Sequence, residues 1–238
     1  MEILKLGADT RQLDNTKYEP YNDDCRIIDL SECVDLKEIP DNMFCFWKAL
    51  EEVILPPNLE KIGDFAFIGS ASLTKINFPE TLKEIGEAAF NDSGFEIFEL
   101  PSSLEIIKPI GSLDNLKLLD MSKCVHLKKI PANFLNWGDK RRLIFLPPYL
   151  EEIGDMAFQS INYLIVPPTV RTIKSMKQVG LICLSENIES LGGLKACVLN
   201  VPEGIEDKYK RLLKKEGLSE SNAVINPIYD ELTFWYTE

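Results

Sequence analysis

Few residues of this chain have the types and spacing that catalysis requires. The best candidate nucleophile is Cys183, because a thiolate attacks electrophilic carbon once a base has removed its proton. The chain has one histidine, His126, and it lies too far along the sequence from Cys183 to be placed as that base. A Cys-dependent enzyme is therefore a remote alternative, and no catalytic residue is expected.

The carboxylates and glycines of the sequence do not indicate a catalytic or phosphate-binding site either. Asp23-Asp24 and Glu151-Glu152 are adjacent pairs, but adjacent residues of a strand point to opposite faces, so solvated charge is expected at both. The motif Ile-Gly-x-x-Ala-Phe occurs three times, yet no phosphate-binding lysine follows it, so Gly63, Gly86 and Gly154 are expected in turns. The sequence predicts no cofactor-binding and no metal-binding residues.

Six cysteines could form a disulfide framework or lie buried as free thiols. A chain of 238 residues is not a small disulfide-stabilised scaffold, and it contains no CxxC pair. We expect reduced cysteines that pack in the core, and hence a reducing compartment. The six are Cys25, Cys33, Cys45, Cys124, Cys183 and Cys197.

Composition restricts the partners. Thirty-eight Asp and Glu residues against 26 Lys and Arg give a net charge of −12, which is unfavourable for binding nucleic acid. No apolar run reaches the ~18 residues of a membrane span, and the first 20 residues lack the pattern of a signal peptide. A cytoplasmic location is expected, or an extracellular or cell-surface one if a leader has been removed.

Internal repeats organise the chain. Three segments align without gaps: LPPNLEKIGDFAF from Leu55, FPETLKEIGEAAF from Phe78 and LPPYLEEIGDMAF from Leu146. Two longer copies, from Ile28 and Leu119, bring Cys33 and Cys124 into equivalent positions. Shorter copies extend the series to about nine units, anchored at Leu30, Leu55, Phe78, Leu100, Met121, Leu146, Val166, Leu184 and Val201.

The pattern within a unit predicts a parallel sheet. An apolar-x-apolar segment ahead of the proline reads as a short strand with both apolar residues in the core, and the proline ends it. The Leu, Ile and Ala-Phe that follow would line the opposite wall of that core. One unit cannot bury its own apolar face, so the units must stack with their strands in parallel.

These motifs resemble the leucine-rich repeats, specifically the BspA-like or Treponema-type class, from roughly Cys25 to Tyr209. The resemblance implies an α/β-type repeat solenoid: a horseshoe with a parallel concave sheet and a mostly irregular or short-helical convex side. It also implies protein binding without catalytic residues. The usual cysteine after Ala-Phe is replaced here by Ser70 and Ser93.

The ends of the chain are predicted to close this stack. Residues 1–24 would form an N-terminal cap, 25–205 the repeats, and 206–238 a capping helix followed by an apolar tail. The helix is expected at Glu206–Lys215, since Ile205, Tyr209, Leu212 and Leu213 fall on one face and Gly217 follows.

Alternation along the strands predicts a binding surface. Outward positions of the first four units mix charged and apolar residues, whereas those of the last four are almost wholly apolar. A contiguous apolar patch of this kind usually marks an interface. The predicted partner-binding residues are Leu143, Phe145, Tyr163, Ile165, Leu181, Cys183 and Val198.

Three readings of this strip stay open. The apolar tail, residues 223–238, could fold back and cover it; two copies of the chain could pair through it as a homodimer; or it could bind a protein or peptide partner. We favour a non-enzymatic protein- or peptide-binding module, with a secreted or cell-surface adhesin as the alternative.

Overall fold

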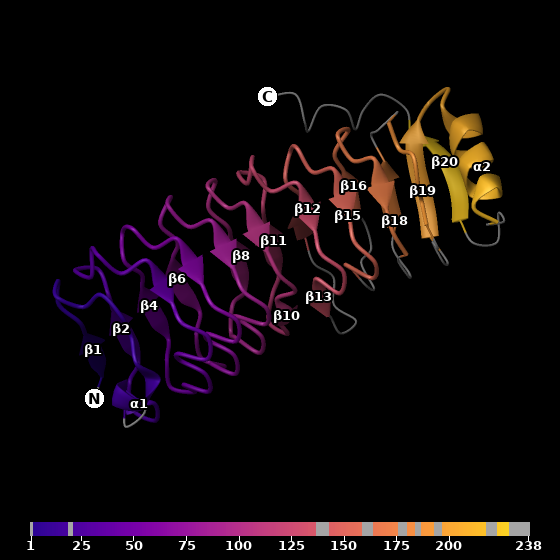
Figure 1. Cartoon of the computed structure of the whole chain (residues 1–238). Helices are drawn as coiled ribbons and strands as arrows, with labels where there is room; N and C mark the ends of the chain where they lie inside the picture. Colours follow the sequence, from indigo (N-terminus) through magenta and orange to yellow (C-terminus); the bar gives the residue numbers. More distant parts are fainter. Residues whose placement is uncertain are drawn as a thin grey trace.

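The computed structural model describes residues 2–18, 21–136, 143–158, 164–175, 180–183, 187–192, 197–217 and 223–228. The chain winds into an elongated β-solenoid of about seven turns, with parallel sheets and little helix (Figure 1). This count is lower than the nine units expected. The units anchored at Leu30 to Val166 each supply two strands, whereas the strand that contains Val201 leads into a helix instead.

One side of the solenoid carries the longer strands, and we call it the long-strand sheet. Each strand pairs in parallel with its neighbour, within three hydrogen-bonded blocks: β1-β2-β4-β6, β8-β11-β14 and β16-β18-β19-β20. The strands are β1 (Ile3–Lys5), β2 (Ile27–Asp29), β4 (Glu52–Ile54), β6 (Lys75–Asn77), β8 (Ile97–Glu99), β11 (Leu118–Asp120), β14 (Leu143–Phe145), β16 (Leu164–Val166), β18 (Gly180–Cys183), β19 (Cys197–Pro202) and β20 (Ala223–Ile228).

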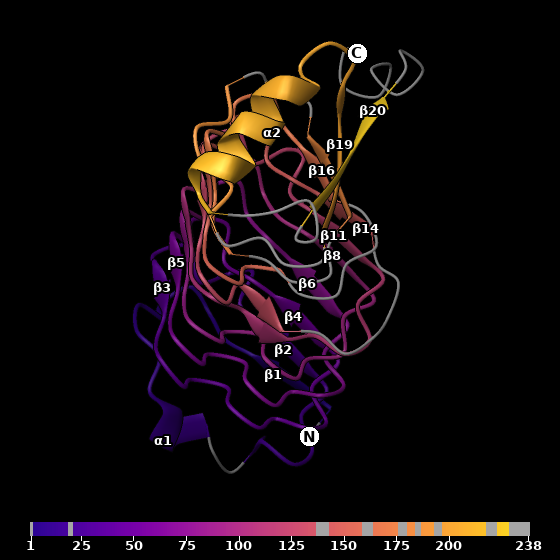
Figure 2. The same cartoon turned by 90° about the vertical axis from the view of Figure 1, so that its right-hand side faces the viewer.

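A second sheet of two-residue strands faces the first across the core (Figure 2). The sequence predicted a mostly irregular or short-helical convex side and did not foresee these paired two-residue strands. Its strands are β3 (Glu38–Ile39), β5 (Lys61–Ile62), β7 (Glu84–Ile85), β9 (Ile106–Ile107), β12 (Lys129–Ile130), β15 (Glu152–Ile153) and β17 (Thr172–Ile173). We call it the short-strand sheet.

The third side of each turn is a loop segment, which we call the turn side. It holds β10 (Gly111–Ser112), β13 (Leu135–Asn136) and the short helix α1 (Asn15–Tyr18). Left-handed backbone recurs there, with φ of 59° at Phe65 and 48° at Ala88. The turns stack closely: a Cβ on Gly63 would lie 2.6 Å from the backbone nitrogen of Asp41, so this position requires glycine.

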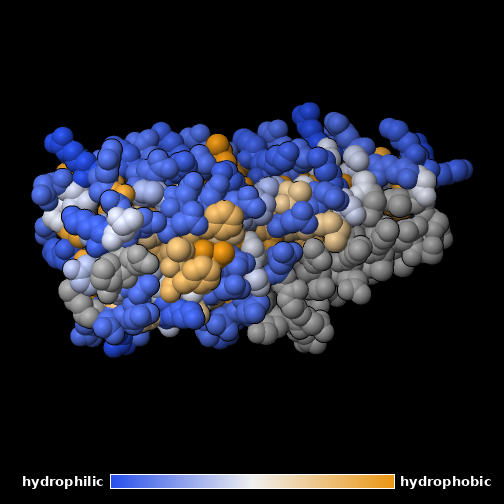
Figure 3. All heavy atoms as spheres, turned by 60° about the horizontal axis from the view of Figure 1, so that its bottom comes forward, coloured by the Kyte–Doolittle hydropathy of each residue, from blue (hydrophilic) through white to orange (hydrophobic). Residues whose placement is uncertain are grey.

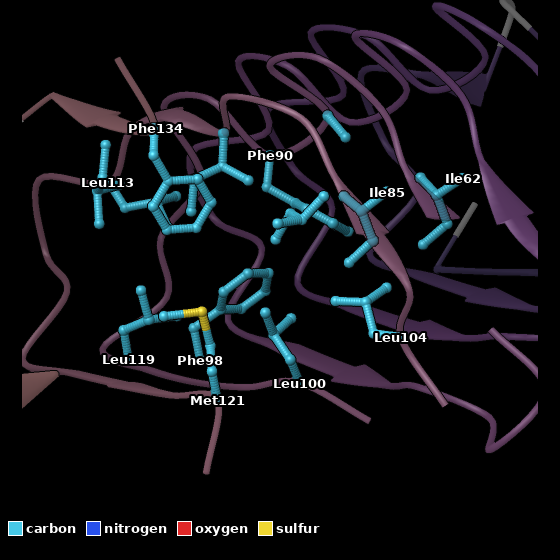
Figure 4. Packing of buried hydrophobic residues seen from close by; sticks show 14 of the residues in the cluster. Ile62, Ile85, Phe90, Phe98, Leu100, Leu104, Leu113, Leu119, Met121 and Phe134 are labelled. Carbon is cyan, nitrogen blue, oxygen red and sulfur yellow. The ribbon is translucent and has the colours of Figure 1, made fainter. Parts of the chain in front are cut away.

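The core is a continuous column of apolar side chains. The predicted wall of Leu, Ile and Ala-Phe is confirmed, since Leu59, Ile62, Ala66 and Phe67 are all fully buried. Equivalent phenylalanines stack along the axis, with ring centroids 5.4 Å apart for Phe44–Phe67 and for Phe67–Phe90. Figure 4 shows part of this core, where Phe98, Leu119 and Met121 lie opposite Phe134.

The C-terminal end follows the predicted helix. α2 (Glu206–Lys215) buries Tyr209 and Leu213, as its apolar face predicted, and contacts β20. The first part of the apolar tail forms β20, which pairs in parallel with β19 and so lengthens the sheet. Residues 223–228 therefore do not cover the predicted strip; residues 229–238 lie outside the described residues.

Candidate functional site

The outward positions of β8, β11 and β14 form two rows across the long-strand sheet. Ile97, Leu118 and Leu143 are register neighbours, and we call them the apolar row. Ile97 is 56% exposed and Leu143 is 64% exposed, while Leu118 between them is half-buried. These are high exposures for aliphatic side chains that stand side by side on one sheet.

Beside it runs a second row, two residues further along each strand. Glu99, Asp120 and Phe145 are register neighbours, and we call them the acidic row. Glu99 is exposed, Asp120 is half-buried, and Phe145 is 43% exposed. Two carboxylates and one aromatic ring thus stand in line next to three aliphatic side chains.

Alternation places these residues outward because the residue between them is core. Ile144 is 7% exposed, whereas Leu143 and Phe145 on either side of it face solvent. Phe98 and Leu119, the register neighbours of Ile144 in the two preceding strands, are also buried. Each strand therefore supplies one core residue and two surface residues, as the period of a strand requires.

The structure describes three side chains of the predicted strip. Leu143 and Phe145 are exposed, and Ile165 is half-buried between the buried Leu164 and Val166. Tyr163 lies outside the described residues, as do the side chains of Leu181, Cys183 and Val198.

The register at β18 differs from the predicted alignment by one residue. The repeat alignment sets Leu184 against Val166, whereas in the structure Cys183 pairs with Val166 and Leu181 pairs with the buried Leu164. A shift of one residue exchanges the two faces of a strand. The assignment of Leu181 and Cys183 to the binding surface stays a prediction, and neither is part of the surface that we consider below.

Sequence reasoning missed Ile97 and Leu118. Each was assessed within its own strand, where it is paired with an acidic residue and looks like ordinary mixed surface. The signal becomes visible only across strands, since the register gathers the apolar members into one row and the acidic members into the other.

Acidic residues on the earlier strands are differently placed. Asp29 has Lys5 as its register neighbour, with 3.7 Å between carboxylate and ammonium, and Glu52 has Lys75. Hydrogen bonds from Ser31 lower the pKa of Asp29, with a smaller contribution from Lys5. Glu99 and Asp120 instead neighbour each other, and no ion pair holds either of them within the part of the chain that the structure describes.

The short-strand sheet neutralises its own charges. Glu38 pairs with Lys61 at 2.8 Å, and Lys108 pairs with Asp64 at 2.9 Å. Lys174 and Lys129 both contact Glu152, at 2.8 and 3.2 Å, and their hydrogen bonds lower the pKa of its carboxyl. This face offers a partner little unbalanced charge.

Figure 3 shows hydrophobic residues gathered among hydrophilic ones on the turn side. Phe46, on this side, is 59% exposed, and its ring lies over Gly69 of the next turn, where a side chain at Gly69 would collide with it. The ring therefore contributes to the packing between turns.

The candidates for catalysis find no support among the described residues. His126 is exposed, and Cys25, Cys33, Cys45 and Cys124 are free. Burial raises the pKa of the Cys124 thiol to about 12, so the group stays protonated and unreactive. Within the described residues, no group of His, Cys, Asp and Glu could hold a metal ion, and no helix is long and apolar enough to cross a membrane.

Solved structures similar to this chain include two bacterial proteins whose sequence identity to it is low. A leucine-rich repeat protein from Bacteroides ovatus is 18% identical with a TM-score of 0.42, over 84% of this chain and 63% of that one. The pneumococcal vaccine antigen PcpA is also 18% identical with a TM-score of 0.33, over 96% of this chain and 78% of that one. This chain thus spans less than two thirds of the Bacteroides protein. A search of curated proteins gives no match.

A family model gives the decisive comparison. Six copies of the BspA type leucine-rich repeat region match residues 37–164, which is more than half of the chain. The matched range contains the complete turns from β5 to β15 and both rows described above. The chain belongs to the BspA-type leucine-rich repeat family.

Proposed function

We propose that this protein is a non-enzymatic binding module that holds a protein or peptide partner on its long-strand sheet. The observation that carries the proposal is the apolar row together with Phe145: four exposed or half-buried apolar side chains on adjacent strands. Membership of a repeat family that is typically non-enzymatic supports it.

The proposal includes the shape of the molecule. We infer that the long-strand sheet is the concave side of a horseshoe, because a strand contributes three residues to a turn and the other two sides contribute the remainder. A solenoid curves toward its less bulky side. A concave sheet would bring the rows of neighbouring strands around one partner.

The test uses a random peptide library displayed on phage and selected against the full chain. Selected peptides are then measured by fluorescence anisotropy against the full chain and against the double variant Leu143→Ser/Phe145→Ser. We expect the double variant to keep its fold, since both side chains are exposed, and to lose at least ten-fold in affinity because the apolar contact is removed.

Two results would contradict the proposal. Equal affinity for the double variant would place the binding surface elsewhere. Loss of folding in the double variant, seen by circular dichroism, would show that both side chains are core residues. Ile144→Ser is the matched control for core disruption, because Ile144 lies between them and is buried. Sedimentation of the full chain separates the homodimer from a binding module, since a dimer through this face would dissociate in the double variant.

A second proposal concerns the compartment. We propose a reducing compartment for this chain, and the four free cysteines of the described residues support it, since Cys33 and Cys124 donate their thiols to backbone carbonyl oxygens. The test quenches intact cells with acid to preserve the thiol state, then unfolds the protein in denaturant at mildly alkaline pH and alkylates every free thiol. Six alkylated cysteines per chain would agree with the proposal, and a disulfide would contradict it.

A further inference from the structure

We propose that the partner is a cationic amphipathic helix that lies across β8, β11 and β14, along the axis of the solenoid. This inference rests on the proposed function and names the chemistry of the partner. It combines three observations: an exposed apolar row, an acidic row parallel to it, and the absence of a cation paired with those carboxylates among the described residues.

Charge complementarity is the first argument. Glu99 and Asp120 are side-by-side neighbours on adjacent parallel strands, about 4.8 Å apart, and like charges at such positions repel. The equivalent repulsion is avoided on β2 and β4, where Lys5 and Lys75 neighbour the acids. A Lys or Arg from a partner would relieve it and gain a charge-assisted hydrogen bond.

Phe145 is the third residue of the acidic row, and it also favours a cationic partner. An exposed aromatic face attracts Lys and Arg side chains through its quadrupole. A partner whose basic residues follow this row would therefore meet two carboxylates and then one ring. An acidic or purely apolar partner would gain nothing from Glu99 and Asp120.

Spacing is the second argument, and it favours a helix. Adjacent strands are about 4.8 Å apart, so three strands repeat the same outward position at that interval. A helix laid across the strands presents residues i, i+3 or i+4, and i+7 at about 5.4 Å per turn, close to this interval. An extended segment presents side chains on one face about every 6.6 Å, so its side chains would not match the interval between the strands. An apolar stripe bordered by a basic stripe therefore matches both rows.

The probes are two fluorescein-labelled synthetic helices of 18 residues with the same leucine stripe. One carries lysines beside the stripe, and the other carries glutamates at those positions. Binding to the full chain is measured by anisotropy at 50 and 300 mM NaCl. We expect the lysine helix to bind at least ten-fold more tightly than the glutamate helix, and to weaken as salt screens the charges.

Variants locate the effect. Glu99→Gln/Asp120→Asn should reduce affinity for the lysine helix at least ten-fold. The matched control, Glu87→Gln/Glu105→Gln, changes net charge by the same amount at exposed positions off the long-strand sheet and should leave affinity unchanged. Equal losses in both pairs, no loss in the acidic row, or no binding of the lysine helix would overturn the inference.

The outcome also separates this inference from the proposed function. If library peptides lose affinity for Leu143→Ser/Phe145→Ser but not for Glu99→Gln/Asp120→Asn, the surface binds a partner and the cationic helix is wrong. If library peptides are insensitive to the Leu143 and Phe145 changes, the proposed function itself fails.

Discussion

At the scale of residues, the same side-chain type has different roles at different positions of the repeat. Phe67 is fully buried in the stacked column of rings, whereas Phe46 lies on the outside of the turn side with more than half of its surface exposed. Cys124 is buried beside the carbonyl of Pro101, whereas Cys45 is half-buried. These contrasts give matched pairs for mutation.

Replacing Phe67 by Ala should cost about 3–5 kcal/mol of unfolding free energy, because it opens a cavity between Phe44 and Phe90. The measurement is chemical denaturation followed by circular dichroism. Phe46→Ala is the control and should cost less than about 1 kcal/mol. Equal costs for the two changes would mean that the stacked column does not carry the core.

The stability of the chain should fall at alkaline pH partly because of Cys124. The folded state holds this thiol proton up to a pKa of about 12, whereas the unfolded chain releases it near the ordinary value of 9.0. Between these pH values the free energy of unfolding therefore falls, by about 1.4 kcal/mol per pH unit for one such group.

The check compares unfolding free energies of the wild type and Cys124→Ala from pH 8 to 11. Other groups titrate in both proteins, so the difference isolates Cys124. The variant should be less stable at pH 8 but should lose stability less steeply as pH rises. Parallel curves would show that the buried thiol does not resist ionisation.

At the scale of elements, several turns contain left-handed backbone positions that non-glycine residues occupy. Ala88 has φ of 48°, a conformation that costs a side-chain-bearing residue roughly 1–2 kcal/mol, whereas the adjacent Ala89 is buried and has no such φ. Of two consecutive alanines, Ala88 thus has a strained left-handed backbone and Ala89 does not.

Ala88→Gly should be neutral or stabilising, because the relief of strain offsets the greater entropy of glycine in the unfolded chain. Ala89→Gly should destabilise by about 1 kcal/mol or more through lost packing and that same entropy. Thermal unfolding of the two variants measures the difference. If both changes destabilise equally, the backbone at Ala88 is not strained.

The sequence predicted the elements that have a long or repeated apolar pattern. It missed the elements that exist only because strands of successive turns pair with one another. The anchors of the long strands and the α2 helix follow from apolar spacing over ten or more residues. The short-strand sheet could not be foreseen, because two residues such as Lys61–Ile62 have no period of their own. The register of β18 was misjudged by one residue, since the shortened units there leave the alignment without the Ala-Phe landmark.

The candidate surface was predicted in the same uneven way. Leu143 and Phe145 were identified because alternation within one strand is visible in the sequence. Ile97 and Leu118 were not, because their significance lies in which residues stand beside them. Strand register depends on how the turns stack, so it cannot be predicted from the sequence of a single strand.

At the scale of the whole molecule, each described turn packs mainly against its neighbours, although the Lys108–Asp64 ion pair reaches across one intervening turn. Stability is then the sum of the turns and the interfaces between them, and the end turns depend on what covers them. At the C-terminal end that cover is α2, whose Tyr209 and Leu213 are buried.

Tyr209→Ala should therefore loosen the C-terminal turns selectively. Hydrogen exchange of backbone amides should become faster in β19 and β20, with little change in β4 to β8, because the lost contact lies at one end of the stack. Leu212→Ala, a neighbouring and more exposed change on the same helix, serves as the control. A uniform acceleration along the chain would mean that the solenoid unfolds as one cooperative unit.

The stacking of β1 at one end and β20 at the other sets how the molecule responds to force (Figure 1). Tension applied between the two ends runs along the axis, parallel to the hydrogen bonds that join successive strands and perpendicular to the strands themselves. In this geometry the force acts on a few hydrogen bonds at a time, so the bonds between two turns break one after another. Each released turn of the regular repeat would lengthen the tether by roughly 80 Å at about 3.5 Å per residue. Force applied between the two ends should therefore extend the stack turn by turn rather than break it in one step.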